Sequence, residues 1–463
     1  MITTRNVLTI TALVVWGALA ARLCFGQGSA APKDRPNVLF LLSDDQQWNA
    51  IGALGNTHIK TPNLDRLVAR GITFSRTYCM GSWSGAVCLP SRAMLMTGRT
   101  LWRVNGKLDG LVTWPETLKN HGYATFFAGK WHNGTESFAR SFTHGGHIMF
   151  GGMSNHLRVP VFRFDADGKY PKENKFTADK FSSELFADDA IAFLETYDAD
   201  RPFFAYVAFT APHDPRMAPA PYAAMYDPDT IPLPANFMPE HPFDNGELRI
   251  RDEMLAPFPR TPKVVRQHIA AYYAMITHMD AQIGRILDAL KKSGHDDDTI
   301  IVFASDHGLA LGQHGLMGKQ NMYEHSLRAP LIIAGPGIPA GKRTGALCYL
   351  LDIFPTVLDL LNIPIPKSVA GRSLKPVIAG EQDTLRRTIY CAYKGLQRMV
   401  RDERFKLIKY HVKNVTTIQL FDLKNDPQEM HDLSKDPAHR KTLESLEAKL
   451  ADWRKRSGDK TSF

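Results

Sequence analysis

Four near-continuous apolar runs, each followed directly by polar residues, give the chain its main pattern. The runs cover residues 36–42, 123–128, 203–209 and 299–304. Strands that are buried on both faces of a parallel sheet are apolar throughout, because neither face alternates with water. The pattern therefore predicts four central strands of an α/β fold.

Charged and imidazole side chains follow the four predicted strands. They are Asp44, Asp45, Lys130, His132, His213, Asp306 and His307. In open α/β sheets, ligands bind beyond the carboxyl ends of the strands. A single histidine after a strand is usually an ordinary loop residue, but this combination at one sheet edge predicts a shared site. Two adjacent carboxylates such as Asp44 and Asp45 also repel each other unless a cation lies between them.

Two segments carry the apolar stripe of an amphipathic helix, residues 61–71 and residues 264–290. The first has Pro near its start and Gly71 as its stop signal, and both are expected to pack on the sheet as scaffold. Two long stretches, 133–180 and 214–262, are rich in glycine, polar residues or proline. We expect them to be loops that form the walls of a substrate cleft.

The sequence changes character near residue 375. Short apolar runs, a hairpin turn and a terminal amphipathic segment follow at residues 398–401, 402–404, 405–410, 419–423 and 437–456. This order predicts antiparallel strands and a terminal helix. We therefore expect a large α/β domain at 31–375 and a small C-terminal subdomain at 376–463.

Residues 1–30 have the pattern of a cleaved export signal. Arg5 precedes an apolar stretch at 7–21, and residues 18–20 offer small side chains for cleavage. The alternative, a membrane anchor, requires about 20 apolar residues, and this stretch is shorter. We expect no stable membrane span and an exported protein, either periplasmic or secreted.

Composition narrows the class of partner. The formal net charge of +9 suits a polyanion, but no basic run interleaved with aromatic residues points to nucleic acid.

Outside the predicted signal, the cysteines are Cys79, Cys88, Cys348 and Cys391. One disulfide could form among them, with its partners left open.

The most specific pattern is Cys-x-Pro-Ser-Arg-x-x-x-x-Thr-Gly-Arg at residues 88–99. Pro90 suits the first turn of a helix, which puts Cys88 at a helix N-terminus, where free N–H groups favour an anion. On composition alone, a buried structural cysteine would be the ordinary interpretation. The seven fixed positions in twelve residues outweigh it, because they resemble the type I sulfatase signature, which marks a cysteine for oxidation to formylglycine.

The resemblance covers essentially the whole mature chain. The family order is present in Asp44-Asp45, Gly-Lys-Trp-His at 129–132, His213, Ser-Asp-His-Gly at 305–308, and Leu-Phe-Asp-Leu-Lys-Asn-Asp-Pro at 420–427. The resemblance implies an alkaline-phosphatase-like α/β/α sandwich with a large mixed sheet and a small C-terminal antiparallel α+β subdomain. It also implies an exported, bacterial-type sulfuric ester hydrolase with its catalytic residues in the large domain.

The resemblance further implies a role for each site residue. The metal would be held by Asp44, Asp45, Asp306, His307 and an oxygen of the modified Cys88. Three carboxylates form a hard site that favours Ca²⁺, with Mg²⁺ as the alternative. His307 could be a ligand or a hydrogen-bond donor to formylglycine, because many members of the family have Asn there. The remaining implied roles are charge stabilisation by Arg92, Lys130 and Lys319, assistance of hemiacetal collapse by His132, and protonation of the leaving alcohol by His213.

The chemistry of sulfate ester hydrolysis explains why the nucleophile would be an oxidised cysteine and not a serine. A serine that attacked sulfur would remain as its own sulfate ester. In a hydrated aldehyde one hydroxyl attacks, and deprotonation of the other expels sulfate as the carbonyl re-forms. Asp306 would be positioned to accept the proton of the attacking hydroxyl. A formylglycine-generating enzyme that acts on Cys88 is the implied maturation partner.

Substrate recognition is expected to use other side chains. Candidates for stacking on sugar rings or pairing with anions are Trp48, Trp83, Arg103, Trp131, Asp214, Arg216, His314 and Arg328. Export and a cleft walled by long loops favour a sulfated glycan, namely a polysaccharide-derived oligosaccharide. The alternatives are a small non-sugar sulfate ester, a phosphodiesterase or phosphonate monoester hydrolase of the same superfamily, and an inactive glycan-binding relative. The last conflicts with the presence of every expected catalytic position.

Overall fold

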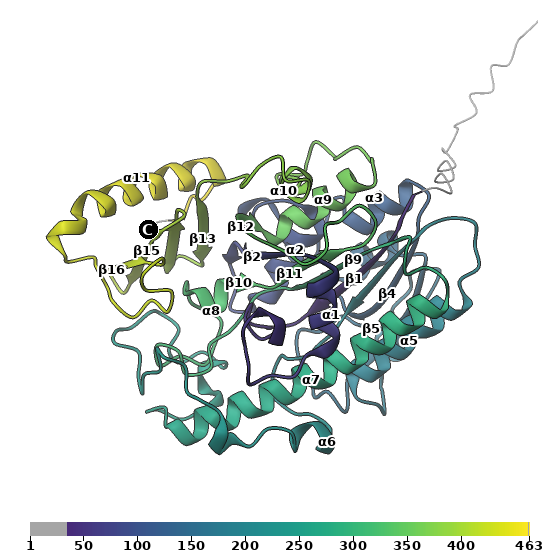
Figure 1. Ribbon diagram of the computed structural model, residues 1–463, viewed down its shortest axis with the longest axis horizontal. Helices are drawn as coiled ribbons and strands as arrows, with labels where there is room; N and C mark the ends of the chain where they lie inside the picture. Colours follow the sequence, from purple (N-terminus) through teal and green to yellow (C-terminus); the bar gives the residue numbers. More distant parts are fainter. Residues whose placement is uncertain (1–34, 462) are drawn as a thin grey trace, which may run out of the picture.

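A computed structural model of the chain describes residues 35–461 and 463, and within them eleven strands form one mixed sheet (Figure 1). The order of neighbours is β10-β2-β11-β9-β1-β8-β4-β5-β6-β7, with β12 beside β2. The strands of this sheet are β1 Asn37–Ser43, β2 Gly71–Tyr78, β4 Ala124–Lys130, β5 His144–Met149, β6 Pro160–Arg163, β7 Phe176–Thr177, β8 Phe203–Ala208, β9 Thr299–Ser305, β10 Arg328–Ala329, β11 Leu331–Ala334 and β12 Lys342–Tyr349. The four predicted strands are β1, β4, β8 and β9, which lie together in the centre and pair in parallel.

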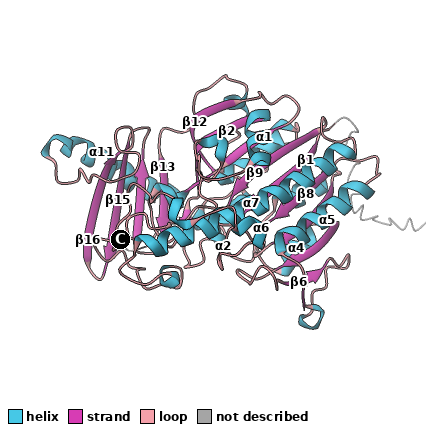
Figure 2. Cartoon of the chain, turned by 60° about the horizontal axis from the view of Figure 1, so that its bottom comes forward, coloured by secondary structure: helices cyan, strands magenta, loops and turns pink. Residues whose placement is uncertain are grey.

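Alternate side chains of β1 enter two separate cores on opposite faces of the sheet. Val38, Phe40 and Leu42 join the core that contains α2 (Cys88–Thr97), α3 (Trp114–Asn120), α4 (Thr135–Ser141) and α9 (Ile353–Leu360). Leu39 and Leu41 join the core that contains α1 (Pro62–Arg70), α5 (Ser182–Thr196) and α7 (Pro262–Lys292). Figure 2 shows α5 and α7 along one face, and the expected α/β/α sandwich is therefore confirmed.

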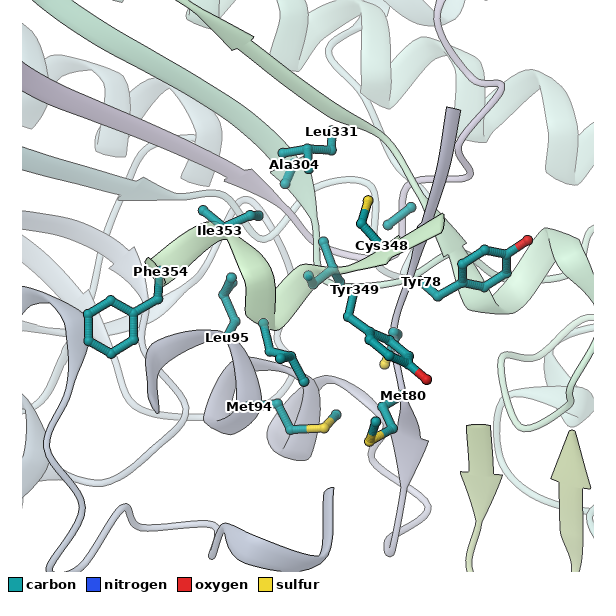
Figure 3. Close-up of a cluster of buried hydrophobic side chains, with 14 of the residues drawn as sticks. Tyr78, Met80, Met94, Leu95, Ala304, Leu331, Cys348, Tyr349, Ile353 and Phe354 are labelled. Atoms are coloured by element: carbon teal, nitrogen blue, oxygen red, sulfur yellow. The ribbon is translucent and has the colours of Figure 1, made fainter. Parts of the chain in front are cut away.

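The core on the α2 face fixes the helix that begins at Cys88. Met94 and Leu95 of α2 are buried, with exposed fractions of 3% and 0%, in the same cluster as Ala304 and Leu331 of the sheet (Figure 3). Burying side chains of this size contributes about 1.5–3 kcal/mol each. The N-terminus of α2 is thus held rigidly against the central strands.

A second sheet of five strands within the described residues follows the order β16-β15-β14-β13-β3. Its strands are β3 Gly81–Ser82, β13 Ile389–Tyr393, β14 Gln397–Arg401, β15 Phe405–Val412 and β16 Val415–Asp422. The predicted hairpin is β14–β15, and the predicted terminal helix is α11 (Arg440–Ser457). Because β3 lies on the segment that leads into α2, this sheet supports the approach to Cys88. The remaining short helices are α6 Ala220–Ala223, α8 Glu324–Leu327 and α10 Lys375–Ile378.

One expectation about local structure was wrong. Residues 133–180 are not one long loop, because α4 lies within them and β5, β6 and β7 extend the main sheet. Gly71 ends α1 as predicted, with an extended backbone (φ of −136°), and it also begins β2. A Cβ at this position would lie 2.2 Å from the carbonyl oxygen of Ile333, so the close approach of β11 explains the glycine.

Cys79, Cys88, Cys348 and Cys391 are all free and buried. None of the helices between residues 35 and 461 is long and apolar enough to cross a membrane. The export signal expected at 1–30 lies outside the described residues. The domain boundary expected near residue 375 stays a prediction.

Candidate active site

Three carboxylates meet at the carboxyl ends of β1 and β9. The two strands pair in register through Ser43 and Ser305, which brings Asp44 and Asp45 beside Asp306. Each carboxylate offers an oxygen within 4.8 Å of the others, and the N–H of Asp45 donates a hydrogen bond of 3.1 Å to Asp306 Oδ1. All three side chains are buried. Asp45 adopts a left-handed backbone with φ of 73°, which is uncommon outside glycine and typical of functionally constrained positions.

Three cationic side chains neutralise these carboxylates. Lys130 Nζ, at the end of β4, lies 2.5 Å from Asp44 Oδ2. Arg92 Nε, from α2, lies 3.1 Å from Asp306 Oδ2, and Lys319 Nζ lies 2.8 Å from both oxygens of Asp45. Removing charges from water is costly unless they are paired. The three ion pairs offset the cost of burying these carboxylates and cationic groups.

The pKa values of the carboxyl groups follow from these pairs. Burial would raise the pKa of Asp44, but the charges of Lys130 and Arg92 outweigh it and hold the pKa well below its usual range. Burial and the neighbouring Asp44 charge raise the pKa of Asp306 to about 6. The site thus contains one strongly acidic carboxyl group, Asp44, and one weakly acidic carboxyl group, Asp306.

Cys88 is the first residue of α2 and faces this network. Its Sγ lies 3.5 Å from His132 Nδ1 and 3.6 Å from Lys130 Nζ. Burial alone would raise the pKa of the thiol, but Lys130, His132 and Lys319 together hold it well below its usual range. A negative charge is therefore favoured at this position, and the N-terminus of α2 stabilises it further.

Some buried polar atoms around the carboxylates have no hydrogen-bond partner. Among them are Asp44 Oδ1, Arg92 Nη2 and His307 Nε2. Asp44 Oδ1 and Arg92 Nη2 lie 3.6 Å apart, which is too far for a hydrogen bond. Buried polar groups are nearly always satisfied, so these atoms fit bound groups: a cation for the carboxylate oxygen and an oxygen atom for the guanidinium. Burial would lower the pKa of His307, but Asp306 and Asp45 raise it to about 9. A protonated Nε2 donates to an oxygen and a neutral one binds a cation, so both expected roles of His307 stay open.

His213 lies on the open side of the group, after β8. Its Nε2 is 3.8 Å from Asp45 Oδ2, and its Nδ1 is 2.8 Å from the carbonyl oxygen of Asp214. His213, Cys88, His132 and Lys319 line one cleft of about 260 Å³. The structure thus brings together all the residues expected to be catalytic or to bind the metal, although only four of them line the cleft.

Part of the cleft wall could not be identified from the sequence. Arg251 and Asp252 lie in the proline-rich stretch 214–262, together with Ile250, and Met153 comes from the stretch 133–180. Arg251 forms bonds of 2.6 and 2.9 Å with the two oxygens of Asp214. Burial opposes ionisation of Asp214, but the Arg251 hydrogen bonds and the His213 charge lower its pKa to about 2. The proline-rich composition indicated a loop, but no motif in it distinguished these residues.

None of the eight residues proposed for substrate recognition is part of the cleft lining. Trp131 is 1% exposed and packs edge-on against Phe127, so it is a core residue. His314 stacks on Tyr323 at 4.0 Å and is buried. Trp48 and Arg328 stack on each other at 3.6 Å, and both are absent from the cleft lining. Trp83, Arg103 and Arg216 are also absent from it, and Asp214 contacts it only through its neighbours Arg251 and His213.

Comparison with known proteins identifies relatives over nearly the whole chain. A family model described as sulfatase matches residues 36–363, and another, described as N-sulphoglucosamine sulphohydrolase, C-terminal, matches residues 312–456. The chain is similar to the N-acetylglucosamine-6-O-sulfatase of Bacteroides thetaiotaomicron, with 30% identity over 91% of this chain and 87% of that protein.

Solved structures agree with this result. The chain is similar to a protein solved in complex with its substrate D-glucosamine-2-N,6-O-disulfate, with a TM-score of 0.78, 27% identity, and coverage of 92% of this chain and 99% of that one. The phosphonate monoester hydrolase of Agrobacterium radiobacter shares the fold, with a TM-score of 0.74, 24% identity, and coverage of 91% and 96%.

Proposed function

Since the chain belongs to the sulfatase family and is a sulfuric ester hydrolase, we propose that it removes sulfate from a sulfated amino sugar of a polysaccharide-derived oligosaccharide. The observation that carries the proposal is the convergence of Cys88, three carboxylates and three cationic side chains beside one cleft. A sulfate ester is an anion, so a nucleophile can approach it only where cationic groups offset its charge. The relatives that act on or bind sulfated hexosamines support the amino-sugar class.

Oxidation of Cys88 to formylglycine would supply a hydrated aldehyde as nucleophile, and a Ca²⁺ ion, with Mg²⁺ as the alternative, would offset charge on the sulfate oxygens. Asp44, Asp45 and Asp306 would hold the ion, since their clustered carboxylates are a hard donor set and Asp44 Oδ1 accepts no hydrogen bond. His307 would either join them or donate a hydrogen bond to the modified residue 88.

The three cationic side chains divide into two roles. Lys319 lines the cleft, and we assign it to the sulfate oxygens. Arg92 is anchored on Asp306 and on the carbonyl oxygen of Lys130 at 2.7 Å, whereas its Nη2 lies 3.6 Å from Asp44 Oδ1 and donates no hydrogen bond, so we assign Nη2 to an oxygen of the reacting groups. Lys130, 3.6 Å from the sulfur of residue 88, would stabilise negative charge on the nucleophile.

The two histidines at the cleft would transfer protons on opposite sides of the reaction. Burial lowers the pKa of His132, although Cys88 opposes this, so the neutral ring can accept a proton from residue 88. His213 also lines the cleft, and we assign it to the side on which the alcohol leaves. A proton donated from its Nε2 would convert a poor leaving alkoxide into an alcohol.

The experiment is sulfate release from a panel of N-acetylglucosamine, N-sulfoglucosamine and N-acetylgalactosamine sulfated at O4 or O6. The enzyme is produced with a formylglycine-generating enzyme, and the aldehyde at residue 88 is verified by mass spectrometry. Cys88→Ala should lose all release, whereas Cys348→Ala, which removes a buried thiol elsewhere, should keep it. A phenylphosphonate monoester serves as the competing substrate: faster turnover of this ester than of every sulfate would overturn the proposal.

We also propose that the chain is exported to the periplasm or secreted, in keeping with an extracellular polysaccharide as the source of substrate. The support is the signal-like sequence of residues 1–30. Expression of the full chain in a Gram-negative host should give a product that begins near residue 30 outside the cytoplasm. A full-length cytoplasmic product would contradict export.

A further inference from the structure

A second cavity, of about 660 Å³, lies between the edge of the main sheet and the C-terminal sheet. Arg76 of β2 and Arg328 of β10 contribute from the main sheet, and Arg401 of β14 contributes from the other. Arg404 and Lys424 complete the cationic lining. This basic cavity shares no lining residue with the candidate active-site cleft.

The acidic groups of the basic cavity do not balance its positive charge. Only Glu324 and Glu403 line it among the acidic residues. Glu324 is already bonded to Lys406 at 3.0 Å and to the Tyr78 hydroxyl at 2.7 Å, and it lies 3.4–3.5 Å from Arg328 and Arg401. Lys406 also pairs with Glu429 at 2.7 Å, and Arg404 pairs with Asp422 at 2.6 Å. The other cationic side chains of the lining, Arg76, Arg328, Arg401 and Lys424, still outnumber Glu324 and Glu403, which leaves an excess of positive charge.

Arg76 is the clearest sign of this excess. Within the described part of the chain, its guanidinium has no hydrogen-bond or ion-pair partner, although the residue is partly buried. Burial and the charges of Arg401 and Arg328 lower its pKa, and they outweigh the opposing effects of Tyr78 and Glu403. A partly desolvated charge held next to like charges is unfavourable unless an anion joins it.

Arg328 adds a second unsatisfied group and an aromatic surface. Its Nε is buried without a partner, and its guanidinium stacks over the half-buried ring of Trp48 at 3.6 Å. Trp48 lines an adjoining hollow that shares Glu324 and Pro427 with the basic cavity. An anion-binding group and an indole at one surface are the combination that recognises a charged sugar unit.

We propose that the basic cavity is a second, non-catalytic site that binds an oxyanion, either free inorganic sulfate or a sulfate or carboxylate group on a saccharide. The saccharide source rests on the proposed function, whereas the oxyanion site does not. Fork-shaped guanidinium groups donate paired hydrogen bonds to such oxygens. A saccharide held there would keep a longer chain on the enzyme while its end is processed elsewhere.

The test measures binding in a Cys88→Ala background, which prevents turnover. Isothermal titration uses two probes separately, inorganic sulfate and a heparin-derived hexasaccharide, and each is compared with and without Arg76→Gln. We expect Arg76→Gln to weaken binding at one class of site by about tenfold, the loss of one charge-assisted contact. Arg76→Lys should restore part of the affinity. The matched control is Arg70→Gln, because Arg70 is already bonded to Asp296 at 2.9 Å and lies outside the cavity.

A second measurement separates binding from a structural role. Without added anion, Arg76→Gln should leave the melting temperature unchanged or raise it, since the variant removes like-charge repulsion. A lower melting temperature together with unchanged binding would assign Arg76 to the fold and overturn the proposal. If sulfate binds but the hexasaccharide does not, the source is the free anion.

The proposed sulfatase function and the proposed second site can each be contradicted without affecting the other. Loss of sulfatase activity despite a verified aldehyde at residue 88 would leave the Arg76-dependent binding intact. Equal affinities of both probes for the parent and Arg76→Gln proteins would remove the second site and leave sulfate release unaffected.

Discussion

At the residue scale, the two histidines of the cleft differ in what holds them. His132 lies against Cys88 and has a left-handed backbone with φ of 71°, whereas His213 is oriented through Nδ1 by the Asp214 carbonyl oxygen. Arg251 fixes Asp214 in turn with two short bonds. This chain of contacts aims His213 Nε2 toward the cleft, as a general acid requires.

We therefore expect His213→Gln to affect sugar sulfates more than aryl sulfates. A sugar alcohol is a poor leaving group and needs a proton, while a nitrophenolate leaves without one. The loss in kcat should be about 10²–10⁴-fold on the sugar sulfate and much smaller on 4-nitrophenyl sulfate. His144→Gln, which changes a partly buried histidine of β5, is the control. An equal loss on both substrates would show that His213 does not protonate the leaving group.

At the scale of elements, the segment after α11 closes the C-terminal sheet through Asp459. The Tyr390 hydroxyl of β13 and Arg398 Nε of β14 each donate a 2.6 Å hydrogen bond to Asp459 Oδ2. The side chains of Asp459 and Arg398 are both fully buried. Burial opposes ionisation, but the hydrogen bonds from Arg398 lower the pKa of Asp459 to about 2.

Asp459→Asn should lower the free energy of unfolding by about 3 kcal/mol at neutral pH, because Arg398 keeps its buried charge without a counter-charge. The folded pKa of about 2 lies below the unfolded value near 3.9. The contribution is therefore fully present above about pH 4 and is lost as the pH falls toward 2. Denaturant unfolding of both proteins from pH 7 to pH 2 measures the difference. Asp452→Asn, on the exposed face of α11, should change little, and a difference independent of pH would contradict the assignment.

The arrangement of the strands and loops also explains which parts of the fold and the site could be predicted from the sequence. The apolar runs identified β1, β4, β8 and β9, and the polar residues after them identified the site, because parallel strands end at one edge. The strands β5–β7 were missed because they carry no long apolar run: β5 contains two glycines, and β6 and β7 have only four and two residues. Arg251 was missed for another reason: its partner Asp214 is 37 positions away, and only the folded loop brings them together.

At the scale of the whole molecule, the site residues come from distant parts of the chain and meet only in the folded state. Asp44 and Asp306 are separated by more than half of the chain, yet the pairing of β1 with β9 places them together. Each buried carboxylate already has a cationic partner in Lys130, Lys319 or Arg92. The fold is thus electrostatically balanced without a further cation, and a bound cation should add stability rather than permit folding.

We expect Ca²⁺ to raise the free energy of unfolding of the whole chain, because the carboxylates that bind it are adjacent only in the native state. At a free concentration one hundred times its dissociation constant, the gain should be about 2.7 kcal/mol. Differential scanning calorimetry with Ca²⁺ and then with chelator measures this gain independently of activity. The chelated protein should still unfold in a cooperative transition at a lower temperature. Asp306→Asn should lose the Ca²⁺ response, whereas Asp288→Asn, on the exposed surface, should keep it. The same melting temperature in both buffers, or an undiminished response in Asp306→Asn, would show that these carboxylates do not form the cation site.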